Sequence, residues 1–244
     1  MTNPKKLTVR VIFAIAVLTG AAALPAFADD SATIYDNSLR LGLYAVFYHS
    51  TADDLTGPYV PPASATSPGV NFKAKDVNTL YLAYVRRLSP HFETELALGL
   101  PPLTKTEGKG PATLGSVPYN GQVISTARWF APTVLLNYKF LDESAKLRPY
   151  IGVGLNYTSF YDRNSTAAGN AASGGPTKVS LPSSLGPAGT VGLSYRAAEH
   201  WNLYASYSIT QVKTKLTANT AGVIRTSHIS FGPQALVLSA GYSF

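Results

Sequence analysis

The chain has 244 residues, no cysteine, 45% hydrophobic residues and a formal net charge of +7. Without cysteine, neither disulfides nor thiolate metal sites can hold the fold, so stability has to come from hydrogen bonding and packing. The positive charge forms no run of Lys and Arg and no basic helix, so the composition disfavours nucleic acid as a partner.

Residues 1–28 have the features of a secretory signal peptide. A basic start that includes Lys5 leads into an apolar stretch over 11–18, and 26–28 read Ala-Phe-Ala, a small-x-small cleavage site. A membrane anchor is the alternative, but the apolar stretch is shorter than the roughly 20 residues of a spanning helix. We expect a mature protein of one domain, residues 29–244. Removing the three basic residues of the leader leaves 17 basic against 13 acidic residues, a net charge of +4.

Eight segments of the mature part alternate apolar and polar residues with a period of two, which is the pattern of β-strands with one apolar side. The alternation covers residues 39–48, 80–84, 92–98, 134–140, 151–157, 185–195, 201–209 and 236–244. In the last segment Leu236, Leu238 and Tyr242 share one side, and the chain stops at the aromatic Phe244, as outer-membrane barrels usually end. The pattern predicts an all-β fold, an eight-stranded antiparallel transmembrane β-barrel.

The connections between these strands alternate in length. Short turns are expected near 89–91, 141–147 and 197–200, and long loops near 49–76, 101–126, 162–183 and 214–231. This alternation is typical of an up-and-down barrel of the Gram-negative outer membrane, with long extracellular loops and short periplasmic turns. An even strand number then places both termini in the periplasm. No segment shows the pattern of an amphipathic helix, and we expect the Pro- and Gly-rich loops to be mobile.

A soluble eight-stranded barrel is the alternative fold. Its polar faces would meet water and carry many Lys, Asp and Glu, whereas here they carry small residues such as Gly152, Gly154, Gly186 and Thr190. Small residues suit a narrow lumen, so we expect the apolar faces to contact outer-membrane lipid.

The same alternation puts seven ionisable side chains on inward positions near the periplasmic ends of the strands: Arg40, Arg87, Glu93, Glu95, Lys139, Arg148 and Arg196. Charges in so narrow a lumen are very costly unless they pair, and the set contains both signs. It predicts an ion-pair network that plugs the base of the barrel. The alternative is that these residues only anchor the barrel at the membrane interface, since a one-residue error in register would turn them outward.

Further from the periplasm, the inward positions are richer in aromatic and apolar residues: Tyr44, Val46, Tyr48, Tyr81, Leu135, Phe160 and Tyr204. Such side chains either line a site for an apolar solute or simply fill a narrow barrel.

Residues 148–160, which read Arg-Pro-Tyr-Ile-Gly-Val-Gly-Leu-Asn-Tyr-Thr-Ser-Phe, closely resemble the fifth-strand signature of the outer membrane protein W family, which includes AlkL and OprG. Residues 132–140, 184–188 and 201–203 and the C-terminal Gly-Tyr-Ser-Phe follow in the family's order. The chain departs from the family at Ala131, where a first proline of Pro-Pro-Thr is frequent, and its long loops match no motif. The resemblance implies a barrel that takes up small hydrophobic molecules passively and releases them sideways into the bilayer.

A sideways exit requires a break in the hydrogen-bond ladder of the wall, and proline lacks the N–H donor that the ladder needs. Pro132, Pro187 and Pro233 lie in or at the loop-side ends of expected strands. Pro187, beside Gly186, is the preferred candidate for a lateral opening, and Pro132 is the second. The alternative is that each proline only marks where pairing ends.

Two other classes of function stay open. A lipid-modifying hydrolase would need Ser, His and an acid on the lipid side, and His228-Ile229-Ser230 faintly resembles the His-x-Ser of the lipid A deacylase PagL. That family has Asn where Phe231 stands here, and no carboxylate is evident to orient His228. A structural or adhesive barrel of the OmpA type would bind partners through its loops, carry no solute and have an ionic lumen along its whole height.

No metal or cofactor site is expected. His49, His91 and His200 lie at strand ends or turns without metal-ligand spacing, and Gly152-Val153-Gly154 is not followed by the helix that a nucleotide fingerprint needs. The expected partners are outer-membrane lipid and small hydrophobic solutes, and no enzyme activity is expected.

Overall fold

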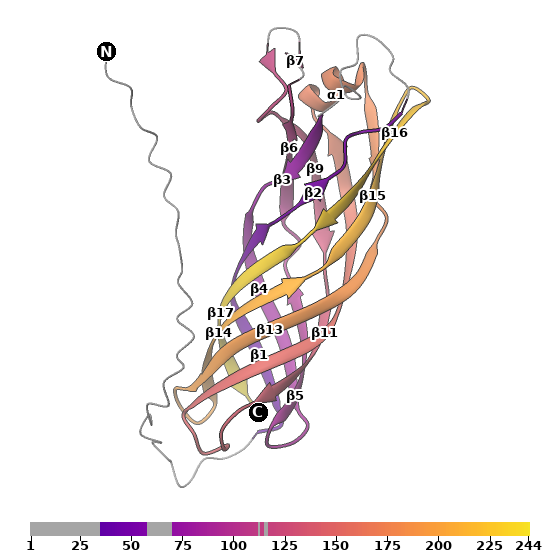
Figure 1. The fold of residues 1–244 in the computed structure, drawn as a ribbon. Helices are drawn as coiled ribbons and strands as arrows, with labels where there is room; N and C mark the ends of the chain where they lie inside the picture. Colours follow the sequence, from indigo (N-terminus) through magenta and orange to yellow (C-terminus); the bar gives the residue numbers. More distant parts are fainter. Residues whose placement is uncertain (1–34, 58–69, 112, 115–116) are drawn as a thin grey trace, which may run out of the picture.

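A computed structural model describes residues 35–57, 70–111, 113–114 and 117–244. The predicted signal peptide and the first mature residues lie outside the described residues, as does the proline-rich stretch 58–62. The described chain forms one tall, closed, antiparallel barrel (Figure 1). Within it, no helix has the length and apolarity to cross a membrane.

Eight strands close the barrel, which confirms the predicted fold class. They are β1 (Asn37–Tyr48), β4 (Val77–Arg87), β5 (Phe92–Gly99), β10 (Thr133–Lys139), β11 (Leu147–Ser165), β13 (Ser184–Arg196), β14 (Trp201–Thr210) and β17 (Pro233–Ser243). The ring closes where β1 pairs with β17, from Ser38 opposite Ser243 to Tyr48 opposite Pro233. The C-terminal Phe244 lies at the end with the short turns, here called the turn end, and the long connections lie at the opposite, loop end (Figure 1).

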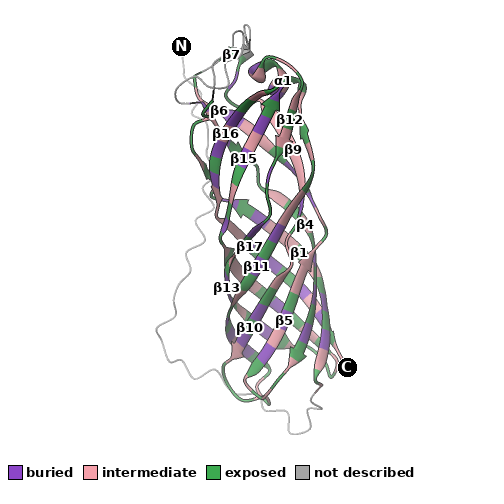
Figure 2. Cartoon of the chain, turned by 90° about the vertical axis from the view of Figure 1, so that its right-hand side faces the viewer, coloured by how far each residue is buried: buried purple, intermediate pink, exposed green. Residues whose placement is uncertain are grey.

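The period of two decides which side of the wall each residue faces. In β1, Leu39, Leu41 and Leu43 are 51%, 60% and 65% exposed, whereas the intervening Arg40 is 1% exposed. Buried and exposed residues alternate in the same way along other barrel strands (Figure 2). A continuous outward band of Leu, Val, Ile and aromatic side chains is typical of a barrel wall in contact with lipid.

The long connections continue the barrel upward as two further groups of strands. On one side β3 (Asn71–Ala74), β6 (Leu103–Lys109) and β9 (Val123–Phe130) lie beside the upper part of β11. On the other, β2 (Thr51–Ala52), β12 (Thr177–Ser180), β15 (Val212–Thr220) and β16 (Val223–Phe231) form a separate sheet. Two short strands, β7 (Thr113–Leu114) and β8 (Val117–Pro118), pair with each other.

These strands differ from the irregular loops expected from the sequence. In β15, Val212, Leu216 and Ala218 are buried while Lys213 and Lys215 are exposed, so the alternation of the barrel continues into the loop segment. The Thr-, Lys- and Ser-rich composition concealed this pattern. Because the outward residues of β15 are polar, this strand extends beyond the apolar band of the wall.

One short helix, α1 (Ala167–Ser173), also lies in a segment expected to be a loop. The Thr166 hydroxyl accepts a hydrogen bond from the Gly169 N–H at 3.1 Å, and the helix ends at Gly174 in the left-handed conformation, with φ of 85°. These seven residues of Ala, Gly, Asn and Ser carry no hydrophobic periodicity, so the sequence showed no amphipathic pattern here and the segment was expected to be a loop.

Candidate functional site: an apolar pocket above an ionic cluster

Four of the residues predicted for the plug meet inside the lower barrel. The Arg40 guanidinium contacts the carboxylates of Glu93 at 2.8 Å and Glu95 at 3.0 Å, and the Lys139 ammonium lies 2.9 Å from Glu93. The side chains of Arg40, Glu93 and Glu95 are at most 7% exposed. Arg40 reaches these partners from β1 across the intervening strand β4, so the pairs span the lumen. We call these four residues the ionic cluster.

Neutral side chains complete the ionic cluster. The Asn137 amide donates to Glu95 at 2.7 Å and to Glu93 at 3.4 Å, and the Tyr81 hydroxyl donates to Glu95. The Arg40 guanidinium carbon lies 3.7 Å from the centre of the Tyr204 ring. Such additional partners are what buried charges need to offset the loss of water. Sequence reasoning missed Asn137, although its inward position in β10 between Leu135 and Lys139 was a usable signal.

The other three predicted plug residues lie closer to the turn end and do not join the ionic cluster. Arg148 pairs with no carboxylate among the described residues; its guanidinium instead donates to the carbonyls of Pro90 at 2.8 Å, Leu141 at 2.9 Å and Phe140 at 3.1 Å. It therefore joins two turns. The alternation indicated that this side chain is turned inward, but a backbone partner on another turn cannot be read from it.

Arg87 and Arg196 meet at one residue of the rim. Arg87 contacts the Glu143 carboxylate at 2.6 Å and Asp36 at 3.3 Å, with 29% of its side chain exposed. Arg196 donates to the Glu143 main-chain carbonyl. This rim sits at the mouth of the turn end, where paired charges anchor connecting turns.

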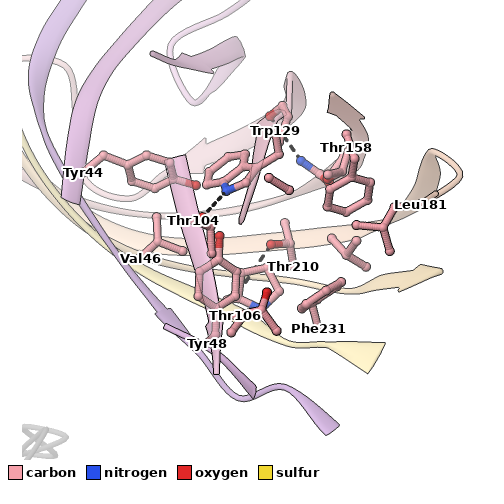
Figure 3. Close-up of a pocket in the computed structure, with 17 residues that line it drawn as sticks. Tyr44, Val46, Tyr48, Thr104, Thr106, Trp129, Thr158, Leu181, Thr210 and Phe231 are labelled. Carbon is pink, nitrogen blue, oxygen red and sulfur yellow. Dashed lines mark hydrogen bonds between the residues drawn. The ribbon is translucent and has the colours of Figure 1, made fainter. Parts of the chain in front are cut away.

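An apolar pocket lies above the ionic cluster (Figure 3). Four of the predicted lumen residues line it: Tyr44, Val46, Tyr48 and Phe160. The space between the lining side chains measures about 640 Å³, open solvent at its mouth included. Its remaining large side chains, Trp129, Leu181 and Phe231, come from β9, from the segment after β12 and from β16, which sequence reasoning had assigned to loops or left unassigned.

The other three predicted lumen residues, Tyr81, Leu135 and Tyr204, do not line the pocket. All three are buried at the height of the ionic cluster: Tyr81 and Tyr204 contact it directly, and Leu135 lies opposite Glu95 in the register of β10 and β5. The Tyr44 and Tyr81 rings are edge to face with centres 6.0 Å apart. Tyr81 thus forms the floor between the pocket and the charges.

Polar groups in the pocket wall are bonded to one another. The Trp129 indole N–H donates to the Thr104 hydroxyl at 2.9 Å, and the Thr158 hydroxyl donates to the Asn156 side-chain carbonyl at 2.6 Å. Buried polar groups with partners of their own do not need a hydrogen bond from a ligand. The pocket therefore offers mainly carbon surface, which favours an apolar occupant.

Two prolines leave incomplete pairs in the wall beside this pocket. In an antiparallel ladder every second pair of opposed residues is a hydrogen-bonded pair, in which each residue donates its N–H to the carbonyl of the other. The Tyr157 N–H donates to the Pro132 carbonyl at 3.0 Å, and the Gln211 N–H donates to the Pro187 carbonyl at 3.1 Å, but neither proline has an N–H to return. We call these places the Pro132 seam and the Pro187 seam.

The Pro132 seam is bridged from inside the barrel. The Asn156 side-chain amide donates to the Ala131 carbonyl at 3.2 Å and to the Thr133 hydroxyl at 2.8 Å, on either side of the proline. These two bonds replace the missing one and hold the chain against β11.

The Pro187 seam has less support. Past the pair of Ala188 and Thr210, β13 runs beside β15, and no register pairs join these two strands in the part of the chain that the structure describes. The Lys213 N–H donates to the Ser184 hydroxyl at 3.0 Å. Gly186 is required here because a Cβ atom would overlap the Gln211 carbonyl oxygen. The third proline, Pro233, lies opposite Tyr48 and lines the pocket.

The residues considered for a hydrolase lie on the outer surface of the second sheet. One carboxylate, that of Asp53, lies near His228: Asp53 Oδ2 is 3.9 Å from His228 Nδ1. That distance is too long for a hydrogen bond, and the two side chains are 77% and 74% exposed. Ser230 shares a shallow surface hollow with them. An exposed, unbonded His is not held as a general base for Ser230.

A closed eight-stranded wall with an apolar exterior and short turns at one end defines the class of small outer-membrane β-barrels of Gram-negative bacteria. Within this class the chain belongs to the OmpW family, whose family model matches residues 63–244. It is 26% identical to outer membrane protein W of Vibrio cholerae over 96% of this chain and 99% of that protein.

Two further similarities were found. The crystal structure of OprG from Pseudomonas aeruginosa has the same fold, with a TM-score of 0.75 at 20% sequence identity, over 88% of this chain and 98% of that one. The dibenzothiophene metabolism operon protein PahQ of Pseudomonas aeruginosa is 32% identical over 57% of this chain and 58% of its own length. Family membership makes this protein a barrel of the outer membrane.

Proposed function

We propose that this protein is an outer-membrane channel for the passive uptake of small hydrophobic molecules, which leave the barrel sideways into the bilayer. The observation that carries the proposal is an apolar pocket that lies above a buried ionic cluster, with Tyr81 between them. In the proposed orientation the loop end faces the exterior, and both the turn end and the C-terminus face the periplasm.

The lining of the pocket supports an apolar solute. Its aromatic and aliphatic side chains, among them Trp129, Tyr48 and Phe231, present carbon surface, while the Trp129 indole N–H and the Thr158 hydroxyl are already bonded to neighbouring side chains. The relative PahQ is named for an operon of dibenzothiophene metabolism, and dibenzothiophene is a flat aromatic molecule without ionisable groups. A molecule of that class fits the chemistry of this pocket.

The ionic cluster argues against release through the base. A solute moving down from the pocket would have to separate Arg40 from Glu93 and Glu95 and leave buried charges unpaired, at a cost of several kcal/mol. An apolar molecule has no charge and no hydrogen-bonding group that could replace these ion pairs. A path through the wall into lipid is favoured, because the solute then passes from one apolar environment into another.

The Pro187 seam is the proposed exit. Asn156, which lies opposite Gly186 in the register, and Val212, which follows Gln211, both line the pocket, so the seam borders the site. The Pro132 seam also borders it at Ala131 but is held by two side-chain bonds from Asn156. The less strongly bonded seam is the easier one to part.

The adhesive alternative predicts a lumen that is ionic along its whole height. The apolar pocket above the ionic cluster favours transport over that alternative. Nothing in the geometry of His228 and Ser230 favours hydrolysis.

The proposal is tested by filling the pocket. Ala127 lies on the pocket wall, and Ala205 is an exposed residue on the outside of β14. Ala127→Phe is expected to reduce uptake of dibenzothiophene by vesicles that contain the purified protein by tenfold or more, whereas Ala205→Phe is expected to leave uptake unchanged. Uptake by the Ala127→Phe protein at the unmodified rate would rule out transport through this pocket.

A further inference from the structure

The charges of the described residues are unevenly divided between the two ends of the barrel. The loop end, comprising residues 49–57, 70–76, 103–130, 159–182 and 212–231, carries 10 basic and 5 acidic side chains. The remaining described residues carry 7 basic and 6 acidic side chains, which include the ionic cluster. The loop end therefore holds a surplus of five positive charges against one at the turn end.

Part of this surplus forms a patch on the outer face of β3, β6 and β9. Lys73 is exposed on β3, Lys75 is exposed just after its end, Lys105 is exposed on β6, and Arg128 lies on β9. Lys73 lies opposite Glu107, and Lys105 lies opposite Thr126 in the register. We call the four cations the basic patch.

The basic patch begins where the apolar band of the wall ends. On β6 the exposed Leu103 is followed two residues higher by Lys105, and on β9 the exposed Phe130 is followed two residues higher by Arg128. Two residues in a strand span roughly 7 Å, so the change from carbon to charge occurs within one step of the pleat. The neighbouring outward Tyr161 on β11 is 41% exposed, as is typical of aromatic residues at a membrane surface.

The cations of the basic patch are only partly neutralised. Lys75 contacts Glu107 at 2.7 Å and Arg128 contacts Asp162 at 3.3 Å. Lys73 and Lys105 form no ion pair with the described residues. Four cations against two carboxylates leave a net charge of about +2 on one face, directly above the last exposed apolar residues of the wall.

We infer that the basic patch binds the phosphate groups of the phosphorylated glycolipid, lipid A, in the outer leaflet around the barrel. The apolar band beneath the patch contacts the acyl chains of the same lipid. In one lipid molecule the acyl chains would pack against Leu103 and Phe130. Its phosphate groups would bind Lys105 and Arg128. A soluble anion would use only the charges. The inference rests on the proposed orientation, in which the loop end is outside, but not on solute uptake.

The test measures lipid binding and leaves transport aside. The full mature chain, in zwitterionic detergent, is titrated with lipid A that carries its phosphates and with the same lipid A after enzymatic removal of them, and bound lipid is counted by native mass spectrometry. The phosphorylated form is expected to bind more tightly. Lys73→Gln with Lys105→Gln is expected to weaken its binding roughly 30-fold, since each basic residue near a lipid surface contributes about 1 kcal/mol, or about fivefold in affinity.

The matched control removes two exposed charges from the opposite end. Arg86→Gln with Lys146→Gln is expected to bind lipid A as the unmodified chain does, because both residues are exposed in the turn-end half. Lys73→Arg with Lys105→Arg is expected to keep full binding. Equal binding of the two lipids, unchanged binding by the Gln pair at the patch, or an equal loss in the control pair would each overturn the inference.

A second measurement uses the unmodified chain alone, so its result does not depend on whether the variants fold. Binding of phosphorylated lipid A to the unmodified chain should weaken as salt is raised, because salt screens exposed charges. Binding that does not respond to salt would show that the acyl chains alone account for it and would overturn the inference as well.

Discussion

The Gln211 N–H donates to the carbonyl of Pro187 across 3.1 Å, and proline has no N–H with which to return the bond. The two residues continue the register of β13 and β14, in which Ala188 lies opposite Thr210. The missing bond thus falls on the side of β14 and β15, whereas the pairing of Pro187 with Leu155 of β11 is retained. Because Pro187 has no amide hydrogen, the pairing between β13 and the segment at Gln211 has one hydrogen bond fewer.

Pro187→Ala should strengthen the pairing at the Pro187 seam. The new N–H can complete the pair with Gln211, and one net hydrogen bond contributes about 1 kcal/mol, so uptake of dibenzothiophene into vesicles should slow about fivefold. Pro90→Ala, in a turn at the opposite end, should not change uptake. Equal rates for Pro187→Ala and the unmodified protein would show that solute does not leave through the Pro187 seam.

Ser184→Ala should act in the opposite direction at the same seam. It removes the acceptor for the Lys213 N–H, the hydrogen bond at 3.0 Å between β13 and β15. Uptake should increase by a few fold, corresponding to the loss of about 1 kcal/mol. Ser144→Ala, on an exposed turn, serves as the matched control. A decrease in uptake would contradict an exit between these strands.

Thr133→Val tests the second seam with little change in side-chain volume. It removes the Thr133 hydroxyl that accepts from Asn156 at 2.8 Å, so the wall at Pro132 should lose about 1 kcal/mol of stability in urea unfolding from lipid vesicles. Uptake should stay at the unmodified rate if solute leaves at Pro187. Faster uptake would transfer the proposed exit to Pro132.

Glu93→Gln should open the base of the barrel. Among the described residues, Glu93 is the carboxylate that contacts both Arg40 and Lys139, and breaking a buried ion pair typically costs about 4 kcal/mol. Ion conductance across planar bilayers should rise and unfolding should occur at lower urea.

The control for Glu93→Gln is the exposed pair of Lys75 and Glu107, at 2.7 Å. Glu107→Gln should cost no more than about 1 kcal/mol, because an exposed ion pair contributes little. If Glu93→Gln is as mild as Glu107→Gln and conductance does not change, the ionic cluster does not seal the base.

Arg148→Lys should destabilise the turns and leave conductance unchanged. The guanidinium donates to four main-chain carbonyls on the two sides of the turn end, at 2.8 to 3.4 Å, and a lysine ammonium cannot match that fork. We expect a loss of about 2 kcal/mol in urea unfolding. A rise in ion conductance as large as that of Glu93→Gln would place Arg148 in the seal after all.

The fold was predictable because one property, the alternation of side chains in a strand, is local. Leu41 and Leu43 lie on one face and Arg40 on the other in any β-strand, whatever the rest of the chain does. The C-terminal strand and the short turns then followed from the same reading. In the loop segments the same alternation exists, as at Val212, Leu216 and Ala218, but Thr and Lys between them masked it.

The candidate site was predictable only in part. Alternation indicated that Glu93 and Arg148 point inward, but it could not show that one joins an ion pair and the other joins backbone carbonyls, because each partner lies on a different strand or turn. The residues that complete the pocket, such as Trp129 and Phe231, lie in segments far apart in the chain from Tyr44. No local pattern relates such segments.

By itself, then, the sequence determined which face of each barrel strand is apolar, since that depends only on the pleat of the backbone. Only the tertiary structure decided which side chains meet across the lumen, where the wall lacks a hydrogen bond and how the loop segments roof the pocket. Those relationships depend on strand register and on the closure of β1 against β17, and both are set by contacts between residues distant in the chain.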